Sequence, residues 1–354
     1  MDPIAHTLFG ATLAETGLKR RSRYATATLL IGANLPDIDV IASLWGSDAA
    51  LYHRRGWSHG VIALVVLPLL LAAAIWLWHR WRRQPGDQAP PFRPGVVLAL
   101  SFLAVWSHPL LDWLNTYGVR LLMPFDGRWF YGDTLFIIDP WVWLLAAAGV
   151  VVARSRTYPS IAGWILLGAL MSALILNSDV APPAVKPAWI AALAMLAALC
   201  WRLRSGAFEL TLARASTATL VVYVCAVYGM ARLAESNAAE RFPAREVQSN
   251  PIPGLPHAHR IVVADDTLYR VIVADGTVYE LPREEPDPIV RAALASPSIR
   301  GFANWTRFPY WKVEETEGSW IVRFWDLRYQ GPDLSGAGIG FAQVEVPKSV
   351  ERGR

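Results

Sequence analysis

Four short polar blocks interrupt the apolar first third of this chain. They are DPIAH from residue 2, NLPDID from residue 34, HRRGWSH from residue 53 and HPLLD from residue 108. Polar groups inside apolar, membrane-type sequence are costly, and they usually serve a function. Imidazole and carboxylate groups together are the ligands that zinc and related metals take in proteins. The composition of the blocks therefore predicts a metal site.

The spacing inside the blocks supports this interpretation. His108 and Asp112 are four residues apart, which on a helix places both on one face about 6 Å apart along the axis. Such a pair can bind one metal ion or two neighbouring ions. Asp37 and Asp39 follow a proline at a spacing that suits a turn presenting two carboxylates, one as ligand and one as base or bridge. His53 and His59 flank a glycine turn that can aim both rings at one point.

The composition indicates which kind of fold must position these side chains. Of the 354 residues, 54% are hydrophobic and only 18% are charged, against about a quarter charged in ordinary soluble domains. This excludes a disordered chain or a plain cytosolic domain and favours a polytopic membrane protein. A half-span is expected at 4–18, and spans are expected at 61–79, 96–116, 139–153, 161–177, 187–201, 216–234 and, interrupted, at 24–45.

Basic residues predict how these spans are oriented. Clusters at 19–23, 80–83, 154–156 and 202–214 fall at every second loop, which is the pattern of cytoplasmic loops. Because the basic excess follows the loops, we expect a membrane topology and no nucleic-acid partner. The opposite, outward ends carry all the residues of the four blocks that could hold a metal: His6, Asp37, Asp39, His53, His59, His108 and Asp112. Their convergence at one membrane face is what a single metal site requires.

Arg54 and Arg55 also map to the outward side, against the rule for basic residues. Guanidinium groups suit an anionic oxygen, phosphate above all, so the pair could clamp a substrate. The alternative is that the two arginines anchor the chain to lipid headgroups. A metal with an adjacent carboxylate and an arginine clamp suits phosphoester hydrolysis.

Residues 240–354 have the pattern of a soluble α+β domain rich in strands. Strands are expected at 261–263, 268–279, 320–325 and 339–346, with a hairpin turn at Asp275-Gly276 and a short helix at 288–295. The segment 242–256 is expected to be a linker. The predicted fold class is therefore mainly α, with a polytopic helical membrane domain at 1–239 and a β-rich domain at 240–354 that lies outside the cytoplasm.

The four blocks resemble the YdjM family of inner-membrane proteins, which are described as membrane-bound metal-dependent hydrolases. The matching pieces are DPIAHTLFG, NLPDID, HRRGWSHG and HPLLDWLNTYG. That family is similar to zinc-dependent phospholipase C and to the single-strand zinc nucleases. The resemblance implies a helical core that holds Zn²⁺ or another divalent metal, with Asp39 as a ligand or the general base and, as the expected ligands, His6, Asp37, His53, His59, His108 and Asp112. Because the further His and Glu ligands of the soluble zinc enzymes are missing from the membrane domain, one or two ions are expected.

The residues and the resemblance together predict a multi-pass protein of the bacterial inner membrane. Its expected activity is hydrolysis of a phosphoester in a lipid or lipid-linked substrate by metal-activated water. Asp39 would take the proton, and Arg54 or Arg55 would stabilise charge on the phosphate. The alternative is a non-enzymatic envelope protein with a structural metal or a proton-handling site.

Overall fold

The computed structural model describes residues 1–82, 90–203, 208–330, 334 and 338–350. The chain divides into two compact units. We call the first the membrane unit, which comprises Met1–Ile38, Arg55–Gly229 and Pro251–His257. The second, the C-terminal unit, comprises Asp39–Arg54, Met230–Asn250 and Ala258–Arg354. The sequence-based boundary between residues 239 and 240 stays a prediction.

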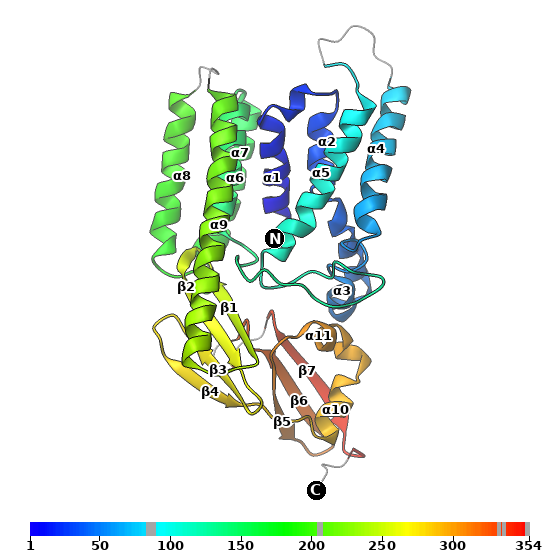
Figure 1. The fold of residues 1–354 in the computed structure, drawn as a ribbon, viewed down its shortest axis with the longest axis vertical. Helices are drawn as coiled ribbons and strands as arrows, with labels where there is room; N and C mark the ends of the chain where they lie inside the picture. The colour runs from blue at the N-terminus through cyan, green and yellow to red at the C-terminus, as the bar shows by residue number, and fades with distance from the viewer. Residues whose placement is uncertain (83–89, 204–207, 331–333, 335–337, 351–354) are drawn as a thin grey trace. The chain divides into compact units, whose positions relative to one another are not determined.

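The membrane unit consists of helices joined by loops (Figure 1). They are α1 (Pro3–Glu15), α2 (Ala25–Gly32), α4 (Ala63–Trp81), α5 (Pro94–Trp113), α6 (Pro140–Arg154), α7 (Tyr158–Leu176), α8 (Val185–Arg202) and the first part of α9 (Glu209–Arg241). Among the described residues, five of these are long and apolar enough to cross a membrane, namely α4, α5, α7, α8 and α9. The predicted class of a polytopic helical domain is confirmed.

Two of the predicted spans differ from simple crossings. The span at 24–45 is divided into α2 and the 3-10 helix η2 (Leu35–Trp45), which are bent by 41° at the break, as a broken span or a re-entrant loop would be. The span at 139–153 is the helix α6, whose 15 residues extend about 22 Å, less than the roughly 30 Å of a bilayer core. Arg83 and Arg204 of the predicted basic clusters lie outside the described residues.

Local sequence signals explain where the helix α1 begins. Asp2 is its N-cap, and the side chain accepts hydrogen bonds from the backbone N–H groups of Ile4 and Ala5. Pro3 occupies the first helical position, where no backbone donor is lost. The indole N–H of Trp143 donates to the same Asp2 carboxylate, so α6 fixes the N-terminus of α1.

Small residues bring α2 against α5. A Cβ added at Gly32 would lie 2.6 Å from the Cβ of Ala104, so no larger residue fits between these helices. Such close approach of backbones is the usual way in which membrane helices associate. The chain leaves α2 at Ala33, whose carbonyl therefore lies next to α5.

The C-terminal unit contains two antiparallel sheets. One has the order β1-β2-β3-β4, and the other has the order β5-β6-β7. Its elements are α3 (Ser47–His53), β1 (Glu246–Ile252) and β2 (Leu255–Ala264) apart from their residues within 251–257, β3 (Leu268–Ile272), β4 (Val278–Pro282), α10 (Pro288–Leu294), α11 (Arg300–Trp305), β5 (Pro309–Glu315), β6 (Ser319–Asp326) and β7 (Phe341–Pro347). The predicted β-rich domain is confirmed, and Gly276 has the positive φ of 85° that the β3–β4 turn needs.

The predicted linker at 242–256 was wrong. It contains all of β1 and the beginning of β2. Its prolines and polar residues made it look like a linker, but Gln248, Ser249 and Asn250 are buried in the fold. The hydroxyl of Ser249 lies 2.8 Å from Nδ1 of His259, and the side-chain amide of Asn250 donates to the carbonyl of Arg328, so these polar residues have partners inside the unit.

Candidate metal centre

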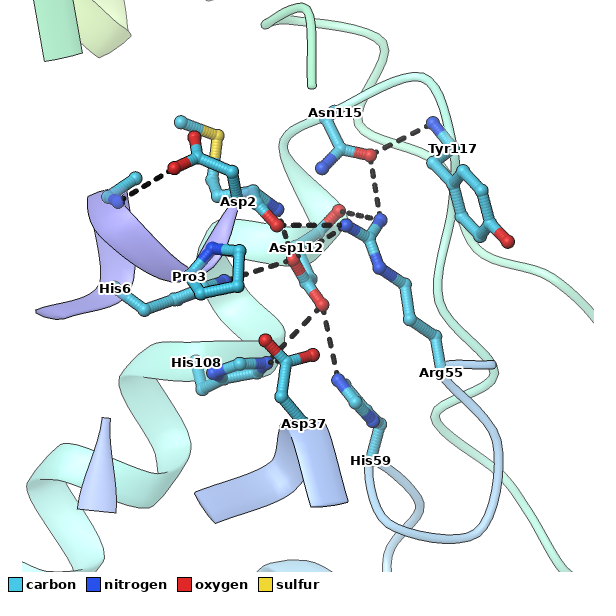
Figure 2. Close-up of polar contacts among 12 residues, drawn as sticks. Asp2, Pro3, His6, Asp37, Arg55, His59, His108, Asp112, Asn115 and Tyr117 are labelled. Carbon is cyan, nitrogen blue, oxygen red and sulfur yellow. Dashed lines mark hydrogen bonds and ion pairs between the residues drawn. The ribbon is translucent and has the colours of Figure 1, made fainter. Parts of the chain in front are cut away.

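Four side chains of the membrane unit meet at one point (Figure 2). They are Asp37 from η2, His59 from the loop before α4, and His108 and Asp112 from α5. Each offers one ligand atom, and these atoms all lie within 4.8 Å of one another. Two imidazole nitrogens and two carboxylate oxygens form a donor set that zinc accepts.

The orientation of His108 is fixed by α2. Its Nδ1 lies 2.6 Å from the carbonyl oxygen of Ala33, so Nδ1 must carry the proton and donate it. The lone pair of Nε2 then points toward Oδ1 of Asp37 at 3.6 Å and Oδ2 of Asp112 at 3.5 Å. A histidine that donates one nitrogen to a carbonyl and presents the other is the usual arrangement around a bound metal.

His59 is positioned by its neighbours in the loop. Its Nε2 lies 3.1 Å from Oδ2 of Asp112, and its Nδ1 lies 2.9 Å from the hydroxyl of Ser58. Gly60 packs against the carbonyl of Met123 so closely that a Cβ would clash with it. This contact holds the loop over the segment that follows α5, with its histidine aimed inward.

The two oxygens of Asp112 face different groups. Oδ2 faces the imidazoles of His59 and His108. Oδ1 lies 2.9 Å from Nη2 of Arg55 and 3.3 Å from Nε2 of His6, and it contacts the amino group of Met1 as well. One oxygen is therefore held by cationic and histidine nitrogens, while the other is directed into the cluster.

Arg55 is a buried partner of this carboxylate, with 2% of its surface exposed. Its Nη1 also donates to Oδ1 of Asn115 at 2.9 Å and to the carbonyl of Gly118 at 3.1 Å, and the guanidinium lies 4.6 Å from the centre of the Tyr117 ring. These contacts make Arg55 a positioning residue for Asp112 (Figure 2). The substrate-clamp role predicted from the sequence stays a prediction.

The remaining sequence-predicted residues are placed in two ways. His6 lies beside the cluster, with its ring stacked on that of His108 at 3.7 Å between centroids. Asp39, Arg54 and His53 belong to the C-terminal unit and are not among the four. Asp39 and Arg54 pair with each other at 2.6 Å, and His53 is exposed at the end of α3 with its ring edge-on to Tyr52.

Burial differs among the four cluster members. His59, His108 and Asp112 have no exposed surface. The side chain of Asp37 is 12% exposed and is the least buried of the four, but both of its carboxylate oxygens are buried. The ligand atoms of the cluster are therefore enclosed by the protein.

Several contributors were missed from the sequence. The Ala33 carbonyl and the Met1 amino group are backbone groups, which carry no signal in a residue pattern. Asn115 and Tyr117 lie in the same HPLLDWLNTYG motif as two ligands, so their nearness to the site could have been expected. Ser58 directly precedes the predicted ligand His59, so its contact with that histidine could also have been expected.

Comparison with known proteins concerns the first part of the chain. The chain is 24% identical over 133 residues to the uncharacterized protein YfhP of Bacillus subtilis (strain 168), an alignment covering 37% of each protein. The aligned part of the chain thus spans little more than a third of that curated relative. No solved structure matches the chain. The profile of the YdjM inner membrane protein family matches residues 1–205, which include the whole cluster. The chain therefore belongs to the YdjM family and is a multi-pass inner-membrane protein.

Proposed function

We propose that this protein is a metal-dependent hydrolase that cleaves a phosphoester in a lipid or lipid-linked substrate. The metal is one or two divalent ions, zinc first among them. The β-rich domain would lie on the extracytoplasmic side, as the basic loops predict.

One observation carries the proposal. The lone pair of His108 Nε2 is turned toward two carboxylate oxygens, and this nitrogen has no hydrogen-bond partner although it is fully buried. Three electron-rich atoms facing one another repel unless a cation lies among them. A divalent ion bound by Asp37, His59, His108 and Asp112 would supply that positive charge.

A bound zinc ion would activate a water molecule and polarise a phosphoryl oxygen. The residues of the chain would do the rest. Arg55 would hold Asp112 in its ligand orientation, and the Ala33 carbonyl would keep His108 in the tautomer that can bind metal. Asp37, the least buried of the four, would complete the ligand set.

The lipid character of the substrate is supported by where the cluster lies. Two of its four residues are on α5, which is long and apolar enough to cross a membrane. A lipid phosphate would reach this site without leaving the bilayer. A soluble substrate would have to enter the membrane unit.

The second candidate is a structural metal or a proton-handling site, and the burial of three ligands favours it. A structural metal is closed off by protein ligands, whereas a catalytic metal keeps a position for water. A proton on Nε2 of His108 would also relieve the repulsion described above. Asp37 is 12% exposed as a side chain, but its carboxylate oxygens are buried as well.

The test is metal content together with turnover, both measured on the full-length protein. Purified wild type is compared with His108→Ala/Asp112→Ala by elemental analysis and in a screen of lipid phosphoesters. We expect about one to two metal ions per wild-type chain, loss of them in the double variant, and turnover that chelation abolishes.

The control is Asp39→Ala/His53→Ala, which changes the same residue types in the C-terminal unit. Metal without turnover in wild type would favour the structural candidate. Chelator-free wild type without metal would leave a proton-handling site and refute the hydrolase proposal.

A further inference from the structure

The 3-10 helix η2 carries a line of exposed apolar side chains. A 3-10 helix has three residues per turn, so side chains three positions apart lie on one line along it. Ile38, Ile41 and Leu44 form one such line, which we call the apolar stripe, and they are between 48% and 81% exposed. Asp39 and Ala42 lie on another line and are almost completely buried. A continuous exposed apolar surface of this kind marks a contact with a protein or a membrane.

The charges around the apolar stripe do not oppose contact with lipid. Between Asp39 and Asp48 the sequence reads VIASLWGS, which contains no charged residue. The carboxylate of Asp39 pairs with Arg54 at 2.6 Å, so the charge inside η2 is balanced. Val40 and Trp45 add two more exposed apolar side chains, and tryptophan is enriched where a bilayer meets water. The composition of η2 therefore suits the boundary between lipid headgroups and acyl chains.

The neighbouring spans indicate the level at which η2 begins. The helix α4 has 19 residues, or about 28 Å, so it can cross the hydrocarbon core alone. It begins at Ala63, shortly after His59, which places His59 at one face of the membrane. The helix α5 can also cross alone, and His108 and Asp112 lie in its last two turns. The cluster therefore marks this face, and Asp37, as a member of the cluster, places the beginning of η2 there.

A helix that begins at this face is not the second half of a crossing span. The bend of 41° between α2 and η2 allows η2 to turn away from the direction of the spans and to follow the membrane surface. The chain is back at the same face at His59, because His59 and Asp37 belong to one cluster. The exposed Trp57 lies at this return point. Membrane-embedded segments thus precede and follow the apolar stripe along the chain, which favours lipid over a protein as its partner.

We propose that η2 is an interfacial helix whose apolar stripe enters the lipid leaflet at the face that holds the cluster. Such helices bury their apolar side about 5–10 Å into the boundary between headgroups and acyl chains. The surface of the chain that binds the bilayer therefore extends beyond its spans. Asp37 belongs to the same helix, so this carboxylate lies at the level of the lipid headgroups, whatever the chemistry of the cluster.

The experiment measures the depth of single positions in the full-length protein, reconstituted in vesicles of phosphatidylethanolamine and phosphatidylglycerol. The two native cysteines are first removed as Cys200→Ala/Cys225→Ala. Ile41→Cys or Leu44→Cys is then introduced, and the new thiol is labelled with the fluorophore NBD. Three quenchers are compared, namely a lipid with a nitroxide near the headgroup, a lipid with a nitroxide near the end of its acyl chain, and iodide in the water.

Two exposed control positions calibrate the quenching. Leu70→Cys, within α4, reports the bilayer interior, and Ala274→Cys, in the turn between β3 and β4, reports the water. We expect the labels at Ile41 and Leu44 to be quenched at least about twofold more by the nitroxide near the headgroup than by the deeper one, because an interfacial helix lies about 5–10 Å deep. Iodide should quench both labels much less than it quenches the label at Ala274.

Any other pattern overturns the inference. Strongest quenching by iodide would mean that the apolar stripe faces water. Strongest quenching by the deeper nitroxide, as at Leu70, would mean that η2 penetrates the bilayer as a span does. Weak quenching by all three would mean that a partner protein or a second copy of the chain covers the stripe. The cysteines replace exposed side chains, so we expect the fold to be retained, and gel filtration of each labelled protein checks this.

Discussion

Two buried aspartates differ in the kind of partner that surrounds the carboxylate. Asp326, in the C-terminal unit, and Asp112, in the membrane unit, both have no exposed surface. Asp326 accepts from Nη2 of Arg328 at 2.8 Å, from the Thr306 hydroxyl at 3.0 Å and from the backbone N–H of Arg307 at 2.8 Å. All of these partners are donors only or hydroxyls, so its lone pairs are satisfied.

Asp112 has partners of another kind. Its Oδ2 faces imidazoles, which can either donate a proton or present a lone pair. The protein's own donors satisfy every lone pair of a carboxylate such as Asp326. A carboxylate oxygen that faces histidines is satisfied only if an imidazole carries a proton toward it or a metal ion lies between them. This difference in partners distinguishes the two sites more clearly than burial does.

The largest expected effect is on the metal. Asp112→Asn removes a charged ligand while keeping the shape, so we expect metal affinity to fall by more than the about 10–100-fold that losing a supporting residue costs, and metal content to fall with it. Asp326→Asn should leave metal content unchanged. Elemental analysis of both full-length proteins measures this. Metal retained by Asp112→Asn would place the ion elsewhere and remove the basis of the comparison.

The next effect is on stability. Asp326→Asn leaves the buried Arg328 without its ion pair, and we expect the C-terminal unit to lose about 3–5 kcal/mol. Hydrogen exchange of the β6 peptides in the full-length protein reports this loss. The double change Asp326→Leu/Arg328→Met is the matched control, because removing both charges should restore most of the protection. Unchanged exchange in the single variant would contradict the assigned role.

A smaller effect is expected at Arg55. Arg55→Lys keeps the charge but cannot reproduce the contacts to Asp112, Asn115 and Gly118 at once, so we expect metal affinity to fall by about 10–100-fold. Competition with a calibrated zinc chelator gives the affinity. Arg54→Lys is the control. If Arg55→Lys binds metal as wild type does but loses turnover, Arg55 contacts substrate and the clamp prediction is right.

The pH dependence of the C-terminal unit provides a further test. Burial alone would raise the pKa of Asp326, but the Arg328 guanidinium and the N–H donors lower it below the usual value of about 3.9. Because the folded pKa is the lower one, the stabilisation is complete above about pH 4 and is lost as the pH falls through the folded pKa. Hydrogen exchange below pH 4 should show this loss in wild type. Hydrogen exchange in Asp326→Asn should depend less on pH than in wild type. Equal pH profiles in the two proteins would contradict the assigned contribution of Asp326.

The smallest effect is expected at His53. Because this histidine is exposed in the C-terminal unit, His53→Ala should keep the metal content of wild type. His59→Ala, the matched change at the other end of the same motif, should lose metal. If both variants lose metal, the predicted ligand role of His53 is right and the cluster has a fifth member.

The sequence predicted the helices well because long apolar runs have few alternatives to crossing a membrane. It also indicated that Asp37, His59, His108 and Asp112 converge, since the spans bring their ends to one face. The sequence could not show which of two neighbouring carboxylates in an irregular segment joins the cluster. Asp37 and Asp39 are two residues apart, but the helix η2 gives them different surroundings, and only tertiary structure pairs Asp39 with Arg54.

The close contact between Gly32 and Ala104 has a consequence for how the protein is made. The four cluster residues all lie within the first 112 positions, but the Ala33 carbonyl reaches His108 only once α5 has docked against α2. During biosynthesis all four cluster residues are therefore present before α6 is translated. They come together only once α5 has docked against α2. If the cluster binds metal as proposed, loading would follow helix docking, and a loaded site would mark a correctly assembled membrane unit.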